Sequence, residues 1–372
     1  MDQQLIRDIQ SGQRRGPAAG VARGLLAVAS FPYAAAMRLR RWAYRRGVLP
    51  SRRAAIPVLS IGNVTVGGTG KTPMVAWVAR QLMRIGRRPA VLLRGYKARG
   101  GKSDEAELLL ELLADRQHES AADSTKGQDT KARWSVPVIV DPNRLRGAEQ
   151  AVGLGADVIV LDDAFQHLRL RRNLDIVLID ATNPFGFGFV LPRGLLREGL
   201  SALRYADAVV ITRSDAVAPP AIDALRQKLA ALAPAASIHS AIHAPAHVVD
   251  QDGAKTPLAA LAGCKVLAFC GVGNPESFFG ALERAGVRLA GKCAFEDHAH
   301  YDPSRISELN LAAELAGADV LLATQKDRVK LNPADLAKPL WTLAVEIQFT
   351  GGQDELIARI RRAIQGARPV AT

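Results

Sequence analysis

The sequence has few cysteines and no long uninterrupted apolar run. Only three cysteines occur in 372 residues, and none belongs to a Cys-x-x-Cys pair. This scarcity excludes a fold held by disulfides and a zinc site built on cysteine pairs, and it is typical of a reducing compartment. With 48% hydrophobic and 23% charged residues, the composition also excludes global disorder. The length allows one large domain or two modest ones.

Acidic residues are scarce at the start of the chain, where most of the positive charge lies. The net charge is +13, and residues 1–53 carry +9 of it because they contain eleven arginines but only Asp2 and Asp8 as acids. The rest of the chain is close to neutral. A basic surface over the whole fold, as nucleic-acid binders have, is therefore excluded, and we expect no nucleic acid as a partner.

Residues 24–37 form an uncharged run inside this basic segment. The run has 14 residues, whereas a helix needs about 20 to span a bilayer. Arginines follow it, where a secretory signal has small residues. We expect residues 1–53 to form an amphipathic helix on an anionic membrane surface. A core-packing helix with a solvated basic end is the alternative.

Beyond Pro57, short runs of Val, Ile and Leu alternate with longer helical stretches. Buried strands that alternate with helices are typical of a parallel sheet covered on both faces. We therefore expect an α/β fold with a doubly wound sheet. The expected strands are Val58–Ile61, Ala90–Leu93, Val136–Val140, Val158–Leu161, Ile176–Ile179, Ala208–Ile211, Val266–Phe269 and Val320–Ala323.

Two stretches indicate how the chain is divided. Residues 218–257 are rich in Ala and Pro and read as helix and loops at a seam between two lobes. We therefore expect a core lobe over residues 54–235 and a smaller C-terminal α/β lobe over residues 236–372. Residues 115–134 are polar and without periodicity, which predicts a surface insertion.

A glycine-rich sequence, GNVTVGGTGKTP, joins the first expected strand to a helix. Backbone N–H groups of such a turn surround phosphate oxygens, and the helix dipole adds to their attraction. Lys71 would reach the β- and γ-phosphates, and Thr72 would ligate Mg²⁺. Thr65 stands where the strict pattern GxxxxGK[ST] has glycine. The predicted phosphate-binding residues are Thr65, Val66, Gly67, Gly68, Thr69, Gly70, Lys71 and Thr72, and a tight structural turn is the alternative.

Two carboxylates, Asp162 and Asp163, follow the strand that ends at Leu161. In P-loop enzymes the acid that coordinates Mg²⁺ lies at this carboxyl edge of the sheet, beside the phosphate loop. Paired buried carboxylates repel each other unless a cation or a proton compensates them. We predict that they hold the metal together with Thr72, and a helix cap after the strand is the alternative.

Several motifs occur together and in order. The motif GGTGKTP is followed by RGY at 94–96, DDAFQH at 162–167, LPRGLLRE at 191–198, FEDHAHY at 295–301 and TQKD at 324–327. This set resembles the tetraacyldisaccharide 4'-kinase family, the lipid A 4'-kinases. The resemblance implies a P-loop NTPase-type kinase, peripheral on the cytoplasmic face of the inner membrane. Such a kinase uses ATP and Mg²⁺ to phosphorylate the 4'-hydroxyl of an acylated glucosamine disaccharide 1-phosphate, and no protein partner is implied.

The resemblance also assigns roles to residues outside the loop. Asp104 would be the base, assisted by His298, with His300 as the rival histidine of the same motif. Arg197 would neutralise charge in the transition state, and Glu198 would reach the water shell of the metal. From the residues alone, a helix cap at Asp104 and a surface ion pair at Arg197 remain open. The motif around Asp104 departs from the family, with Ser103 and Ala106 in place of Gly and Pro.

The main rival class is a nucleotide switch such as a P-loop GTPase or a metallochaperone. Residues 212–215 (TRSD) follow an expected strand and are faintly similar to the guanine-reading NKxD. Both the Asn and the Lys of that motif are replaced, and the chain has no Cys-x-Cys or histidine cluster for loading a metal. A kinase is therefore the favoured interpretation.

Overall fold

A computed structural model describes residues 3–95, 103–114, 134–296 and 299–365 of the chain. The described residues fall into two compact units. The first consists of Met1–Arg94, Ile139–Ile242 and Phe349–Thr372, and the second of Gly95–Val138 and His243–Gln348. The basic N-terminal segment therefore belongs to the first unit and is not a unit of its own.

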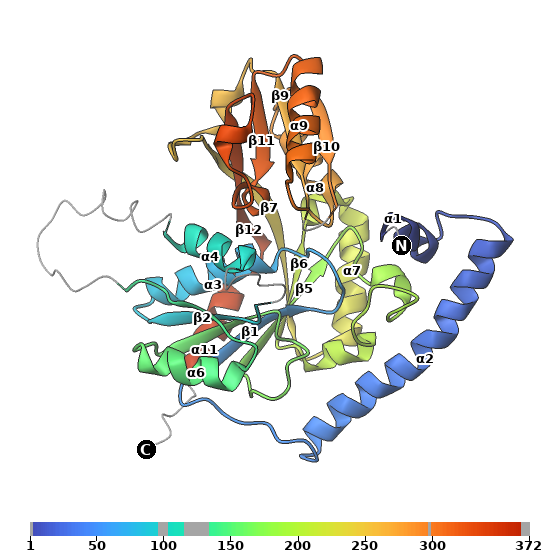
Figure 1. The fold of residues 1–372 in the computed structure, drawn as a ribbon. Coiled ribbons are helices and arrows are strands. Elements are labelled where there is room, and N and C mark those ends of the chain that lie inside the picture. Colours follow the sequence, from blue (N-terminus) through green and yellow to red (C-terminus); the bar gives the residue numbers. More distant parts are fainter. Residues whose placement is uncertain (1–2, 96–102, 115–133, 297–298, 366–372) are drawn as a thin grey trace, which may run out of the picture. The chain divides into compact units, whose positions relative to one another are not determined.

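The first unit is built on a parallel sheet (Figure 1) with the strand order β7-β6-β5-β1-β4-β2-β3. Parallel pairing joins β1 to β4 and β5, β4 to β2, and β5 through β6 to β7. The bounds are β1 (Val58–Asn63), β2 (Pro89–Leu93), β3 (Val138–Val140), β4 (Val158–Asp162), β5 (Leu174–Asp180), β6 (Ala208–Thr212) and β7 (Ser237–Val249). The predicted α/β fold with a parallel sheet is confirmed.

Local sequence features explain where two helices of this unit begin. Pro219 and Pro220 begin α7, where a missing N–H is not needed. Asn143 caps α6 by accepting hydrogen bonds from the N–H groups of Leu145 and Arg146. The helices are α1 (Gln3–Ser11), α2 (Pro17–Arg45), α3 (Lys71–Arg84), α6 (Arg144–Gly153), α7 (Pro219–Leu232) and α11 (Gln353–Gln365), with short 3₁₀ turns η1 (Gly186–Gly188), η2 (Leu200–Tyr205) and η3 (Ser214–Ala216).

Helix α2 is longer than the sequence pattern indicated. The uncharged run covers only 24–37, yet the helix has 29 residues and continues through Pro32 to Arg45. It is one helix in the described part of the chain that is long and apolar enough to cross a membrane by length and composition, and 6% of that apolar window is buried. One face packs on the unit, where the Ser30 hydroxyl donates to the carbonyl of Val190 at 3.0 Å.

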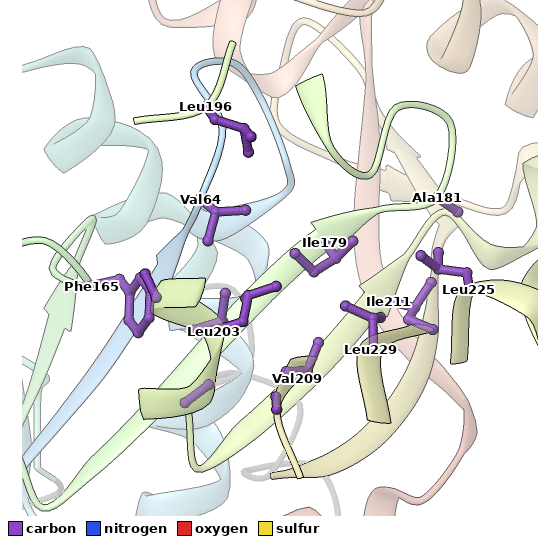
Figure 2. Close-up of a cluster of buried hydrophobic side chains, with 14 of the residues drawn as sticks. Val64, Phe165, Ile179, Ala181, Leu196, Leu203, Val209, Ile211, Leu225 and Leu229 are labelled. Atoms are coloured by element: carbon purple, nitrogen blue, oxygen red, sulfur yellow. The ribbon is translucent and has the colours of Figure 1, made fainter. Parts of the chain in front are cut away.

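An apolar cluster lies on one face of the first sheet and extends to the phosphate loop. Figure 2 shows Val64 and Leu196 next to each other at one end of it, with Ile179, Ile211 and Leu229 farther along. All five side chains are at most 2% exposed. Because packing of this kind tolerates little change in volume, the loop residue Val64 is held in a fixed place.

The second unit carries its own parallel strands, in the order β10-β9-β11-β12. The strands are β9 (Val266–Cys270), β10 (Leu289–Ala294), β11 (Val320–Thr324) and β12 (Leu340–Gly351), and the short β8 (Lys255–Thr256) pairs antiparallel with the end of β7. The helices are α4 (Asp104–Ala114), α8 (Pro275–Arg284), α9 (Pro303–Leu315) and α10 (Gln325–Arg328), with the turns η4 (Leu258–Leu261) and η5 (Pro333–Asp335).

The division of the chain differs from the expected one. Strand β7 passes from the first unit into the second after Ile242, and β12 returns to the first before Phe349. The stretch read as helix and loops therefore contains a 13-residue strand. The C-terminal helix α11 belongs to the first unit. Its buried residues Leu356, Ile360 and Ile364 form an apolar stripe at a spacing of four.

Gly62 of β1 offers a test of this packing. A Cβ atom at this position would lie 2.6 Å from Cβ of Phe165 and 2.7 Å from its backbone nitrogen. We expect Gly62→Ala to lower the free energy of unfolding in urea by about 1–3 kcal/mol, the usual cost of overpacking. Gly153→Ala is the control, because nothing lies within 4 Å of the added atom. Equal stability of the two variants would contradict the close approach of β1 and Phe165.

Candidate active site

The phosphate loop lies between β1 and α3, as the sequence predicts. Gly67 and Gly70 adopt positive φ angles of 122° and 85°, which non-glycine residues rarely adopt. Nothing lies within 4 Å of a Cβ atom built on Gly67 or Gly68, so space is open beside the loop backbone. The loop thus has the conformation and the room that a phosphate group needs at a helix N-terminus.

One side of the loop is tied to the segment LPRGLLRE. The Val66 N–H donates to the carbonyl of Leu195 at 2.7 Å, and the Arg197 N–H donates to the carbonyl of Val64 at 2.8 Å. Thr65, where the strict motif has glycine, pairs with Leu196 in an antiparallel bridge. The departure at Thr65 is therefore accommodated, because this part of the loop continues as extended backbone.

The other side of the loop is held by residues that follow β6. The Thr212 hydroxyl donates to the carbonyl of Thr69 at 3.1 Å, and the Arg213 guanidinium donates to the carbonyl of Gly68 at 2.8 Å. Arg213 also forms an ion pair with Asp180 at the end of β5. The two residues that were faintly similar to a guanine-reading motif thus serve here to position the phosphate loop.

Asp162 and Asp163 lie where the sequence predicts, at the carboxyl end of β4. Asp162 is 4% exposed and is in register with Ile61 of β1. Asp163 has a φ of 50°, in the left-handed region, which turns the chain after the strand. Its carboxylate lies 3.5 Å from the Lys71 ammonium and accepts two hydrogen bonds from one Arg197 nitrogen, both at 2.8 Å. Lys71, Asp163 and Arg197 are thus brought together.

Negative charge at this strand end is balanced by three cations, of which Arg144 is buried and Lys71 and Arg197 are partly exposed. Burial raises the pKa of Asp163, but the charges of Lys71 and Arg197 outweigh it, and the net shift of the pKa is downward. Arg144 donates to the carbonyl of Asp162 at 2.9 Å and is 3% exposed. Burial lowers the pKa of Arg144 to about 10, against the opposing effect of the charges of Asp162 and Asp163. Asp163 and Arg144 are therefore both charged at neutral pH.

Glu198 forms an ion pair that the sequence analysis did not predict. Its Oε2 atom lies 2.7 Å from Nε of Arg41 on α2, and the two side chains are 4% and 8% exposed. Arg41 also donates to the carbonyl of Phe165. Arg41 is therefore buried against the unit and is not among the arginines that could face an anionic membrane, as we expected of this basic segment. The expected contact of Glu198 with a metal stays a prediction.

The residues fit a nucleotide phosphate and a magnesium ion. Thr69 Oγ1 is buried and has no hydrogen-bond partner among the described residues, so it is available to a phosphate oxygen. In the described ranges, no group of three or more His, Cys, Asp or Glu side chains could hold a metal without further ligands. This suits Mg²⁺, which binds through one or two carboxylates, water and substrate phosphates. Thr72, Asp162 and Asp163 are the residues that could supply oxygen ligands to the ion.

Asp104 lies in the second unit, at the first residue of α4, and its side chain is 45% exposed. Its predicted partner His298 lies outside the described residues, as does Tyr96 of the RGY motif. The neighbouring residue Ala299 is described. The Lys330 ammonium lies 3.8 Å from Asp104 Oδ2 and donates to the carbonyl of Ala299 at 3.4 Å. One buried lysine therefore joins Asp104 to the residue that follows His298.

The TQKD motif has a structural role in the same unit. Asp327 is fully buried, and its Oδ2 accepts hydrogen bonds from the Thr324 hydroxyl at 2.6 Å and from the Gly271 N–H at 3.0 Å. Burial, and then the negative charge of Asp327, raise the pKa of Tyr301 in the FEDHAHY motif well above its ordinary value. The two motifs thus meet where Asp327 lies close to Tyr301.

Three residues that contact the candidate site were not predicted from the sequence. Arg144, Arg213 and Lys330 contact the strand end, the phosphate loop and Asp104 respectively. A basic residue directly after a buried strand was a usable signal for Arg213. For Lys330 no local signal exists, because Asp104 and Ala299 lie far along the chain, and no sequence feature singled out Arg144.

A phosphate loop and an acidic strand end on a parallel sheet define a P-loop nucleotide-binding protein, and the cations at Asp163 suit one that transfers a phosphoryl group. Residues 22–365 match the family model described as tetraacyldisaccharide-1-P 4'-kinase, LpxK. The chain belongs to this family. It is therefore a lipid A 4'-kinase, and the alternative of a GTPase or metallochaperone switch finds no better support.

Known proteins that are similar to the chain support the same family assignment. The tetraacyldisaccharide 4'-kinase of Geobacter metallireducens is 42% identical over 83% of this chain and 88% of its own length. That of Geobacter sulfurreducens is 40% identical over 92% of this chain and 94% of its own length. A crystal structure of LpxK from Aquifex aeolicus in complex with ATP matches with a TM-score of 0.68 at 25% identity, over 92% of this chain and 99% of that one. The family resemblance drawn from the motifs is confirmed.

We expect Lys330→Met to lower kcat by about threefold to tenfold, with an unchanged KM for ATP, because a partly exposed ion pair is screened by solvent. Lys330→Arg should restore part of the loss, since it keeps a cation beside Asp104. Steady-state kinetics and a thermal melt check this. Lys292→Met is the control, because it removes a surface ion pair with Glu283 in the same unit. If Lys330→Met and Lys292→Met behave alike, Lys330 does not position Asp104.

Proposed function

We propose that the chain transfers the γ-phosphoryl group of ATP, with Mg²⁺, to the 4'-hydroxyl of an acylated glucosamine disaccharide 1-phosphate at the cytoplasmic face of the inner membrane. The observation that carries the proposal is the ion-paired group Lys71, Asp163 and Arg197 beside an open phosphate loop. The ATP complex of the Aquifex aeolicus relative supports the choice of nucleotide.

Different residues of the first unit would bind the phosphates, the metal ion and the transferring group. The loop Thr65–Thr72 would hold the phosphates through its backbone N–H groups, and Lys71 would contact the β- and γ-phosphates. Thr72, Asp162 and Asp163 would hold Mg²⁺, which neutralises charge on the phosphates when bound. Arg197 is partly exposed, at 26%, and would turn from Asp163 to the transferring group. Each contact acts mainly by positioning and by charge.

Proton acceptance would fall to the second unit. We assign the base to Asp104 and the supporting role to His298. An imidazole next to a carboxylate orients it and takes up positive charge as the hydroxyl loses its proton. Lys330, which contacts both Asp104 and the carbonyl of Ala299, supports this pairing.

Helix α2 supports a membrane surface as the place of reaction. The side of α2 opposite Ser30 exposes large apolar side chains, each between 51% and 74% exposed. They are Val21, Leu25, Val28, Phe31, Leu39 and Trp42. Their spacing of three, four or eight residues keeps them near one stripe of the helix, and an apolar stripe of this length on a soluble surface is typical of a membrane contact. Arg38 and Arg45 are exposed beside it and suit anionic lipid.

The kinase assay uses ATP, Mg²⁺ and the acylated disaccharide 1-phosphate, and it follows a product that has gained one phosphate. We expect Lys71→Ala to lower turnover on the order of 10²-fold or more while the fold is kept, because one preorganised charge contact at the reacting group is lost. Arg84→Ala, at the far end of α3, is the control with the same charge change. Near-normal rates with Lys71→Ala, or a preference for GTP, would contradict the proposal.

Vesicle sedimentation tests the membrane assignment. We expect the triple change Leu25→Ser, Val28→Ser and Phe31→Ser to release the protein from anionic vesicles, because insertion of the apolar stripe is lost while charge attraction alone holds weakly. Release of wild type by high salt should be partial, since insertion is not screened. In the control variant, serine replaces Leu110 and Leu315, two exposed leucines of the second unit. Binding of the triple variant at the wild-type level would show that α2 does not enter the membrane surface.

A further inference from the structure

A cavity of about 270 Å³ lies in the first unit between the C-terminal half of α2 and residues 198–205. Five arginines line it, and Glu198 is the one acidic residue of its lining. The arginines are Arg38, Arg41, Arg45, Arg46 and Arg204. A small cavity with so many guanidinium groups is unusual for a surface that only faces water, because like charges repel when they are held together.

The single carboxylate neutralises only one of these cations. Glu198 pairs with Arg41 at 2.7 Å. In the described residues, no carboxylate lies within ion-pair distance of Arg38, Arg45, Arg46 or Arg204. Arginines in the last turn of α2 also suit the helix dipole. Arg38 and Arg204 lie outside that turn, so the dipole does not account for the whole cluster.

Aromatic rings hold part of this cluster in place. The Arg45 guanidinium stacks 4.1 Å from the centroid of the Tyr205 ring, and Arg41 lies 5.3 Å from the same ring. A stacked guanidinium keeps its N–H edge available for hydrogen bonds. Such an edge matches the geometry of phosphate oxygens, which arginine binds through two parallel hydrogen bonds.

The surroundings indicate what carries the phosphate. Trp42 lines the cavity and is 51% exposed, and it ends the apolar stripe of α2 described above. A ligand seated here therefore has its charge among arginines and its apolar part along the helix. A volume of about 270 Å³ admits a phosphate and part of a headgroup, not acyl chains.

We propose that this arginine pocket binds the phosphate group of a phosphate-bearing lipid. The proposal rests on the membrane location in the proposed function. Two sources share this chemistry, the headgroup of an anionic phospholipid in the bilayer and the 1-phosphate of the lipid that is phosphorylated. Glu198 joins the pocket to the active site, because it follows Arg197, the partner of Asp163, directly in the chain.

The test compares Arg38→Gln/Arg45→Gln with Arg15→Gln/Arg23→Gln, which removes the same charge from the same segment outside the pocket. Arg41 is left in place because its loss would leave Glu198 buried without a partner. Binding is measured to phosphatidylcholine vesicles with and without phosphatidylglycerol. We expect the pocket variant to lose about fivefold or more in affinity for the anionic vesicles beyond the control. Arg38→Lys/Arg45→Lys should fall between, since charge is kept and the paired hydrogen bonds are lost.

A kinetic arm separates the two sources. With the lipid substrate in neutral detergent micelles, a raised KM and an unchanged kcat in the pocket variant would assign the pocket to the 1-phosphate of the substrate. A raised KM in anionic vesicles alone would assign it to bilayer phospholipid. Equal behaviour of pocket and control variants in both arms would overturn the proposal. Lack of wild-type activity on the disaccharide would instead contradict the proposed function, and the vesicle result would still stand.

Discussion

The ion-paired group at Asp163 joins three separate parts of the first unit. Lys71 comes from the start of α3, Asp163 from the end of β4, and Arg197 from the segment that is tied to the phosphate loop. Because two cations hold one carboxylate, the loop, the strand end and this segment keep a common position. The left-handed backbone at Asp163 is part of the same arrangement, since it turns the carboxylate toward both cations.

The second unit contributes through a different kind of contact. Asp104 and the residue after His298 are almost 200 positions apart, and the buried Lys330 contacts both. In the same unit, the buried Asp327 accepts hydrogen bonds from the Thr324 hydroxyl and the Gly271 N–H, and these bonds join β11 to the end of β9. The second unit thus orders Asp104, the residue to which we assign the base, through Lys330.

The sequence predicted the parts that depend on local signals. All eight expected strands are present, because continuous apolar runs between helices have few other solutions. Strands β7, β8, β10 and β12 were not predicted. β7 contains three histidines and Pro245, and β10 alternates half-buried and exposed residues around Gly291 and Lys292. The phosphate loop and Asp162–Asp163 could be predicted from the spacing of their residues in the sequence. The pairing of Glu198 with Arg41 could not be predicted, because it depends on how α2 packs.

The packing of α2 has a consequence for attempts to make a shorter, more soluble protein. Removing the N-terminal segment takes away Arg41 and leaves Glu198, which is 3% exposed, as a buried carboxylate without its partner. Such a loss typically costs about 3–5 kcal/mol. Tyr33, whose hydroxyl donates to the carbonyl of Arg197 at 2.9 Å, would be lost as well. The N-terminal segment and the first unit are therefore one piece of folded protein, and truncation at residue 53 would destabilise the enzyme.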